Sequence, residues 1–148
     1  ETDLCWRAWV MGYQVGFEPQ SVIVHKMGAT SSTMKSAFIN YHSFKNRIRT
    51  IIKNTGPYTL LWMLPIHLST CLGLIIFFLF SGQSRGAFSI IKAVGWNIQV
   101  LGQTWKMRTR VQSKRKVTDT EIFKQVMKNP PLSFYLHHLS LVKADLEK

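Results

Sequence analysis

The sequence predicts a mainly helical chain. We expect one helix and one short strand from the C-terminal edge of an α/β domain, followed by membrane-associated helices. Three observations favour this fold class: apolar residues at helical spacing open the chain, a β-branched run follows a proline, and 23 consecutive uncharged residues occupy the middle. Their order indicates the end of a globular domain joined to a membrane anchor.

Charge is distributed unevenly along the 148 residues, whose formal net charge is +12. No carboxylate lies between Glu18 and Asp119, whereas fourteen of the nineteen lysines and arginines lie there. An enzymatic site built on carboxylates must therefore use the ends of the chain. The two cysteines, Cys5 and Cys71, are too few for a disulfide framework or a cysteine-built zinc site.

Residues 1–34 are expected to form the edge of the globular domain. The stretch from Asp3 to Met11 has helical spacing, and Gly12 is a typical residue just beyond a helix end. The run from Ser21 to His25 predicts a strand because β-branched residues dominate it. No signal-peptide pattern opens the chain, so we expect it to be the C-terminal part of a longer protein.

Residues 35–56 predict a basic amphipathic helix that connects this edge to the next segment. Apolar residues alternate with cations from Lys35 to Asn54, which suits a helix lying along a surface. The Gly-Pro pair at 56–57 ends it.

Residues 57–105 predict a membrane-associated helical hairpin. The uncharged run 58–80 exceeds the roughly 20 residues that span a bilayer's hydrocarbon, and Tyr58 and Trp62 are suitable interfacial anchors. The alternative is a buried helix of a soluble core. The stretch 87–105 is more polar and suits an amphipathic helix in the headgroup layer.

Residues 106–148 predict a basic cytoplasmic tail with short helices. The Thr118 and Glu121 pair is a capping-box signature for a helix extending to about Lys128. Cations from Lys106 to Lys116 are expected to bind anionic lipid heads, at about 1 kcal/mol each.

Cations flank the uncharged run on both sides, and the positive-inside bias disfavours a single crossing. Either the two segments form a hairpin that returns to the cytoplasm, or both lie partly within the cytoplasmic leaflet. The sequence favours the hairpin, with both ends cytoplasmic.

The first 34 residues carry an ordered series of short motifs: ETDLCWR at 1–7, Gly12-Tyr13, Pro19, VIVH at 22–25 and Gly28. In order and spacing this series resembles the end of the catalytic domain of family 2 glycosyltransferases of GT-A type, most closely their bacterial rhamnosyltransferase-like branch. The nucleotide-binding half of that family and its Asp-x-Asp motif are not in this chain, so the resemblance implies that these residues alone are inactive.

The resemblance implies catalytic roles for Glu1 and Asp3. Glu1 would be the general base that deprotonates the acceptor hydroxyl in an inverting transfer. Asp3 would be structural or face the acceptor, and Arg7 would bind substrate. Without the resemblance, Glu1 and Asp3 are acids favoured by the helix dipole, and Arg7 is the i, i+4 partner of Asp3.

The resemblance also makes His25 a candidate ligand of a divalent metal, Mn²⁺ or Mg²⁺, which the preceding half of the enzyme would mostly hold. Lys26 and Thr30 would lie near the donor's phosphates. The alternative for His25 is an ordinary surface or core histidine.

The expected function is therefore sugar transfer from a nucleotide-sugar donor to a lipid-linked or polysaccharide acceptor. It would take place at the cytoplasmic face of the cell membrane, in envelope glycan synthesis. The alternative is a non-enzymatic cationic membrane-anchoring protein. Nucleic acid is not an expected partner, because the long uncharged run argues against it and no recognised motif is present.

Overall fold

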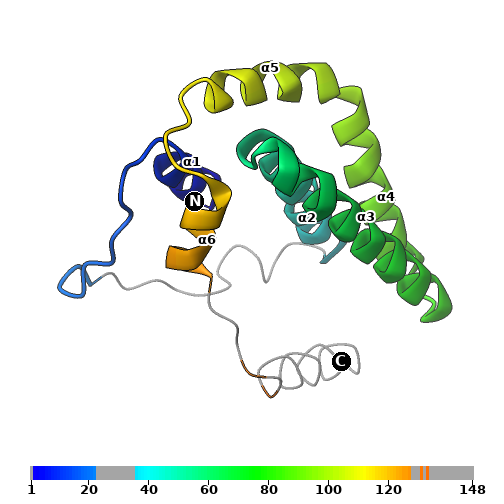
Figure 1. Ribbon diagram of the computed structural model, residues 1–148. Coiled ribbons are helices and arrows are strands. Elements are labelled where there is room, and N and C mark those ends of the chain that lie inside the picture. The colour runs from blue at the N-terminus through cyan, green and yellow to red at the C-terminus, as the bar shows by residue number, and fades with distance from the viewer. Residues whose placement is uncertain (1, 23–35, 128–130, 132, 134–148) are drawn as a thin grey trace.

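The computed structural model describes residues 2–22, 36–127, 131 and 133, and its regular elements are all helices (Figure 1). In chain order they are α1 (Thr2–Val10), α2 (Ser36–Asn54), α3 (Pro57–Phe80), α4 (Ser84–Gln99), α5 (Leu101–Gln112) and α6 (Asp119–Val126). The described part of the chain is thus helical, as the sequence led us to expect for most of it.

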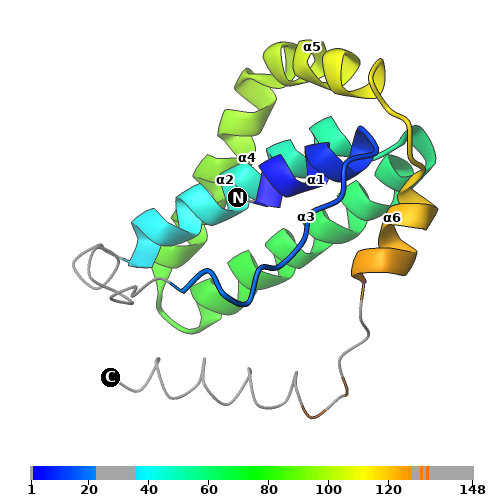
Figure 2. The same ribbon diagram turned by 90° about the vertical axis from the view of Figure 1, so that its left-hand side faces the viewer.

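Helices α2, α3 and α4 lie side by side (Figure 2). After the turn at 55–56, α3 runs back along α2, and the ring of Phe44 stacks on that of His67 with 6.2 Å between centroids. After the turn at 81–83, α4 runs back along α3. The buried apolar side of α2 consists of Ile48, Ile51 and Ile52.

Helix α5 turns away from α4, packs against α2 and brings the chain back toward α1 and α6 (Figure 1). The sequence predicted one helix over 87–105, but the helix is interrupted at Val100, which separates α4 from α5. A second small core joins α1, α5 and α6 through Val10, Val111 and Ile122. The backbone N–H of Lys116 donates to the carbonyl of Val10 at 2.8 Å, which fixes the segment before α6 to the end of α1.

Two local signals in the sequence are confirmed. Gly12 has φ +83°, a left-handed conformation that glycine adopts without strain, and it follows the end of α1. The capping box of α6 is formed, because the Thr118 N–H donates to Glu121 at 2.8 Å and the Glu121 N–H donates to the Thr118 hydroxyl at 3.3 Å. Helix α6 ends at Val126, slightly before the expected position.

The predicted α/β edge is wrong. The described residues contain no strand, and Ser21 and Val22, which would begin it, are not in regular structure. The rest of that run, 23–25, lies outside the described residues. A β-branched run becomes a strand only when a neighbouring strand accepts and donates its backbone hydrogen bonds. The helices that make up this structure offer no such neighbour.

Candidate functional site

Helix α3 is the most exposed apolar element of the described chain. Within the described residues it is the one helix long and apolar enough to cross a membrane, and only 6% of its most apolar window is buried. Of its residues only Cys71 is buried. A core helix of a soluble protein would be covered by its neighbours, whereas α3 presents Leu61, Ile66, Leu72 and Phe80 to its surroundings.

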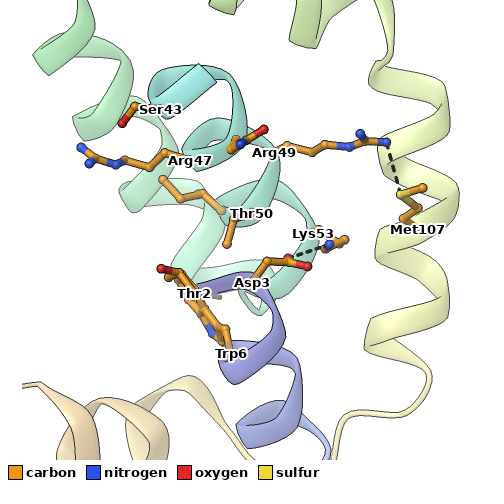
Figure 3. A pocket seen from close by; sticks show the side chains of 11 residues that line it. Thr2, Asp3, Trp6, Ser43, Arg47, Arg49, Thr50, Lys53 and Met107 are labelled. Carbon is orange, nitrogen blue, oxygen red and sulfur yellow. Dashed lines mark hydrogen bonds and ion pairs between the residues drawn. The ribbon is translucent and has the colours of Figure 1, made fainter. Parts of the chain in front are cut away.

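A pocket of about 570 Å³ lies where α1 packs against α2 (Figure 3). We call it the α1–α2 pocket. It is lined by Thr2, Asp3 and Trp6 of α1, by Ser43, Asn46, Arg47, Arg49, Thr50, Ile51 and Lys53 of α2, and by Met107 of α5. Three of these side chains are cationic and one is a carboxylate, so the lining has a formal charge of +2 (three minus one).

Asp3 holds the two helices of the pocket together. One carboxylate oxygen accepts from Lys53 at 2.6 Å and from the Asn54 side chain at 2.9 Å, and the other accepts from Arg7 at 3.1 Å. Burial by itself raises the pKa of the Asp3 carboxyl. Hydrogen bonds from Lys53 and Asn54, with the charges of Lys53 and Arg7, outweigh burial and hold that pKa below its ordinary value.

Two donors of the α1–α2 pocket lack partners among the described residues. The Nε of Arg49 and the indole Nε1 of Trp6 are buried and make no hydrogen bond. The guanidinium of Arg49 contacts the sulfur of Met107 at 3.3 Å and the ring of Trp96 at 5.3 Å, neither of which is a strong acceptor. Figure 3 shows Arg47 and Arg49 extending to opposite sides of α2. The pocket therefore carries net positive charge, and two of its lining residues have buried donors without a partner among the described residues.

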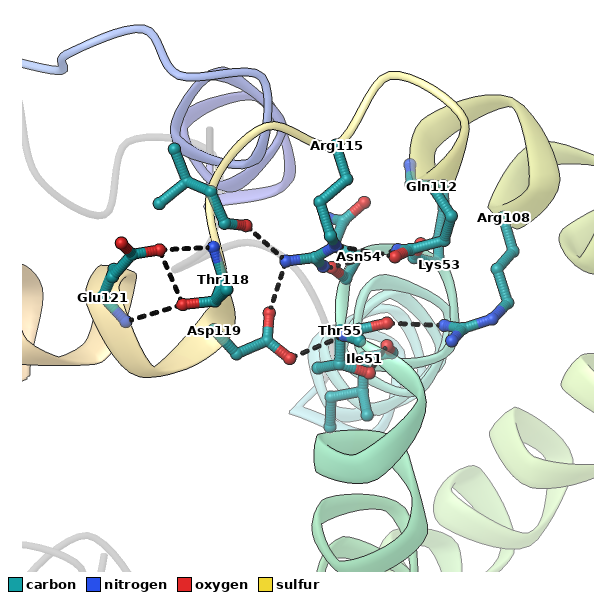
Figure 4. Close-up of polar contacts among 12 residues, drawn as sticks. Ile51, Lys53, Asn54, Thr55, Arg108, Gln112, Arg115, Thr118, Asp119 and Glu121 are labelled. Carbon is teal, nitrogen blue, oxygen red and sulfur yellow. Dashed lines mark hydrogen bonds and ion pairs between the residues drawn. The ribbon is translucent and has the colours of Figure 1, made fainter.

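A second polar group lies at the α2–α3 turn, and we call it the carbonyl clamp: Arg108, Gln112, Arg115 and Asp119 (Figure 4). Arg108 donates to the carbonyls of Ile52 and Thr55 at 2.6 and 2.7 Å. Gln112 donates to the carbonyls of Lys53 and Asn54, and Arg115 also donates to the carbonyl of Asn54. Cations at the end of a helix also interact favourably with its dipole.

Asp119 completes the carbonyl clamp from α6. Its carboxylate accepts from the backbone N–H of Gly56 at 2.6 Å and from Arg115 at 2.9 Å. The clamp thus satisfies the last carbonyls of α2 and the N–H that precedes α3. No motif in the sequence predicted this clamp, because Arg108 and Arg115 belong to a basic cluster that we expected to face lipid. Their inward direction follows from the position of α5 across the end of α2.

Two of the predicted site residues are brought together, and the other four cannot be placed. Asp3 and Arg7 form the i, i+4 ion pair that the sequence allowed. Glu1, His25, Lys26 and Thr30 lie outside the described residues. Within the described part of the chain no three His, Cys, Asp or Glu side chains gather as metal ligands. Reasoning from sequence missed Trp6, Thr50 and Met107 as pocket residues, because apolar and small polar residues carry no distinctive signal.

Comparison with known proteins found no matching family model, no matching curated protein and no matching solved structure.

Proposed function

We propose that this chain is the membrane-associated C-terminal part of an inverting glycosyltransferase. The enzyme would transfer a sugar from a nucleotide-sugar donor to a lipid-linked or polysaccharide acceptor at the cytoplasmic face of the membrane. The observation that carries the proposal is the α1–α2 pocket. The pocket lies between α1, whose sequence resembles part of family 2 glycosyltransferases, and the basic helix α2. Helix α2 leads directly into the exposed apolar helix α3.

The chemistry of the pocket suits the anionic part of an acceptor. Lipid-linked sugar acceptors carry phosphate groups, which guanidinium donors bind through charge-assisted hydrogen bonds. Arg47 and Arg49 have no carboxylate partner among the described residues, and the buried Nε of Arg49 has no acceptor at all. A phosphate in the pocket would pair with one of these two guanidinium groups, since they extend to opposite sides of α2 (Figure 3).

Glu1 is the proposed general base, and Asp3 is a positioning residue. A base has to accept a proton from the acceptor hydroxyl, and a carboxyl whose pKa is lowered by several donors is a poor acceptor. Asp3 already bonds to Lys53, Asn54 and Arg7. Its part in the proposal is to hold α1 against α2.

The proposal is tested on the full-length protein, in which it places an Asp-x-Asp-bearing nucleotide-binding domain upstream of Glu1. Glu1→Gln should lower kcat for sugar transfer by at least about 100-fold, the usual contribution of a general base. The exposed Glu18 is the matched control, and Glu18→Gln should leave kcat unchanged. Unaltered turnover in Glu1→Gln would exclude that base, and a different domain upstream would exclude the enzyme.

The acceptor site is tested separately by Arg49→Gln, with the exposed Arg110→Gln as its control. In Arg49→Gln the KM for a lipid-linked acceptor should rise about tenfold, because a charge-assisted hydrogen bond is lost. The KM for the nucleotide sugar should not change. Equal rises for both substrates, or no rise, would remove the pocket from acceptor binding.

A non-enzymatic cationic membrane-anchoring protein is the second candidate. It is favoured by the bonding of Asp3, since both of its carboxylate oxygens already have partners within the fold. In this case Glu1→Gln and Arg49→Gln would have no catalytic phenotype. Sedimentation with vesicles that contain phosphatidylglycerol would be the property to measure.

A further inference from the structure

We propose that α2, α3 and α4 lie together in the plane of one membrane leaflet, and that α3 does not cross the bilayer. The surface concerned is the exposed apolar side of α3 and α4, and its partner is a single leaflet that contains anionic lipid. This inference rests on how the helices pack and is independent of the proposed enzymatic activity.

The packing of α2 on α3 sets the depth of the α2 cations in any crossing arrangement. His67 comes ten residues after Pro57, or about 15 Å along the helix, which is half of a hydrocarbon core of about 30 Å. Phe44 stacks on His67, so residues near Phe44 share its level. Lys45 follows directly, and the guanidinium of Arg47 lies 5.8 Å from the Phe44 ring centroid. A crossing α3 would therefore carry both cations near the middle of the bilayer.

The contacts of α4 with α2 also set the depth of a cation on α4, Lys92, in any crossing arrangement. Lys92 comes eight residues after Ser84, or about 12 Å from the turn that joins α3 to α4. Its ammonium lies 5.5 Å from the ring centroid of Tyr41 on α2, and the Asn97 side chain donates to the carbonyl of Lys45 at 3.1 Å. These contacts keep α4 in register with α2, so a crossing hairpin would carry Lys92 into the hydrocarbon as well.

None of these cations has an anionic partner in this part of the fold. The sequence between Glu18 and Asp119 contains no carboxylate, and the three ion pairs of the described residues all use Asp3 or Asp119. Arg47 and Lys92 are exposed. Charged side chains inside a bilayer are normally paired, or face a protein interior or water. The sequence favoured a crossing hairpin, but the packing favours the in-plane arrangement.

An in-plane arrangement separates the exposed apolar residues of α3 and α4 from the cations of α2 and α4. The exposed apolar residues of the two helices would enter the acyl region, and they include Leu61, Ile66, Leu68, Leu72, Ile76, Phe77, Leu79, Phe80, Phe88 and Ile91. The cations of α2 and α4 would remain at the level of the lipid phosphates, which attract them. Tyr58 and Trp62, both exposed, suit the same interface.

Depth-dependent quenching tests the proposal in vesicles of phosphatidylcholine and phosphatidylglycerol. A fluorophore is attached at Leu61→Cys, Leu68→Cys or Phe80→Cys, one at a time, with Cys5 and Cys71 replaced by serine and alanine. In the in-plane arrangement the ratio of quenching by deep and by shallow spin-labelled lipids should agree within about twofold among the three positions. A crossing helix would give position 68 a much higher ratio than both end positions, and that result would overturn the proposal.

Cysteine accessibility in the full-length protein gives a second measurement. Ser81→Cys lies at the far end of α3, and the exposed Thr109→Cys on α5 is its matched reference. With a membrane-impermeant maleimide, both positions should react from the same side of the membrane in sealed vesicles, or position 81 should be shielded from both sides. Reaction of position 81 only from the side opposite to position 109 would show a crossing and end the proposal.

Discussion

The carbonyl clamp and the α1–α2 pocket use the same kind of side chain in opposite ways. In the clamp, Arg108 and Arg115 donate to backbone carbonyls at the end of α2, and Arg115 also meets a carboxylate. In the pocket, Arg49 keeps a buried donor with no acceptor among the described residues. Both groups border the last turns of α2.

The difference separates cations that hold the fold from cations available to a ligand. A guanidinium whose donors are satisfied contributes to stability, and losing it leaves buried carbonyls without partners. A guanidinium without a carbonyl or carboxylate partner contributes little to stability, and its charge attracts an incoming anion. The same amino-acid type is therefore expected to respond differently to substitution in the two places.

The largest effect is expected for Arg108→Met. Two hydrogen bonds to the carbonyls of Ile52 and Thr55 are lost at a buried position, so the free energy of unfolding should fall by about 3 kcal/mol. Denaturant unfolding in detergent micelles, followed by circular dichroism, measures it. Arg110→Met on the same helix is the control, since Arg110 is exposed. Equal losses in the two variants would contradict the clamp.

A smaller loss, about 2 kcal/mol, is expected for Asp119→Asn. The amide is a weaker acceptor for the Gly56 N–H and no longer carries the charge that pairs with Arg115. Glu121→Gln is a matched control on the same helix, because Glu121 lies in the exposed capping box and an amide can still accept there. The same unfolding experiment should place the Asp119 variant well below the Glu121 variant, and the reverse order would speak against the clamp.

Asp3→Asn should cost about 1 kcal/mol, because the partners of Asp3 are partly exposed. The effect has a defined pH dependence. Since the folded-state pKa of Asp3 is lowered from 3.8, its contribution is fully present above pH 3.8 and disappears as pH falls through 3.8 toward the folded value. Stability curves of the wild type and the variant should therefore converge in acid. Curves that stay parallel down to acid pH would show that the carboxylate charge is not involved.

The smallest effect on stability is expected for Arg49→Gln, within about 0.5 kcal/mol of wild type. Inorganic diphosphate provides a second measurement of the same difference, because a ligand that binds only the folded state raises Tm. Tm should rise for the wild type and for Arg110→Gln, but not for Arg49→Gln, in thermal unfolding scans at fixed ionic strength. A rise of equal size in all three would show that the anion binds elsewhere.

Much of the local structure could be predicted from the sequence. The uncharged run became α3, the alternation of isoleucines and cations became α2, and Gly12 and the Thr118–Glu121 pair mark helix boundaries. These signals depend on residues within one or two turns of each other. The predicted strand failed because it required a partner that the described residues do not supply.

The sequence by itself determined most of the helices that the structure describes, that one of them is apolar enough for a membrane, and that carboxylates are confined to the two ends of the chain. Only the tertiary structure decided that Arg108 and Arg115 face backbone carbonyls, that Asp3 bonds to Lys53, and that Arg49 keeps an unused donor. The physical reason is the separation along the sequence of the residues that interact. Helix formation follows from neighbours three or four residues apart, whereas the partner of a long cationic side chain depends on helices that come from distant parts of the chain.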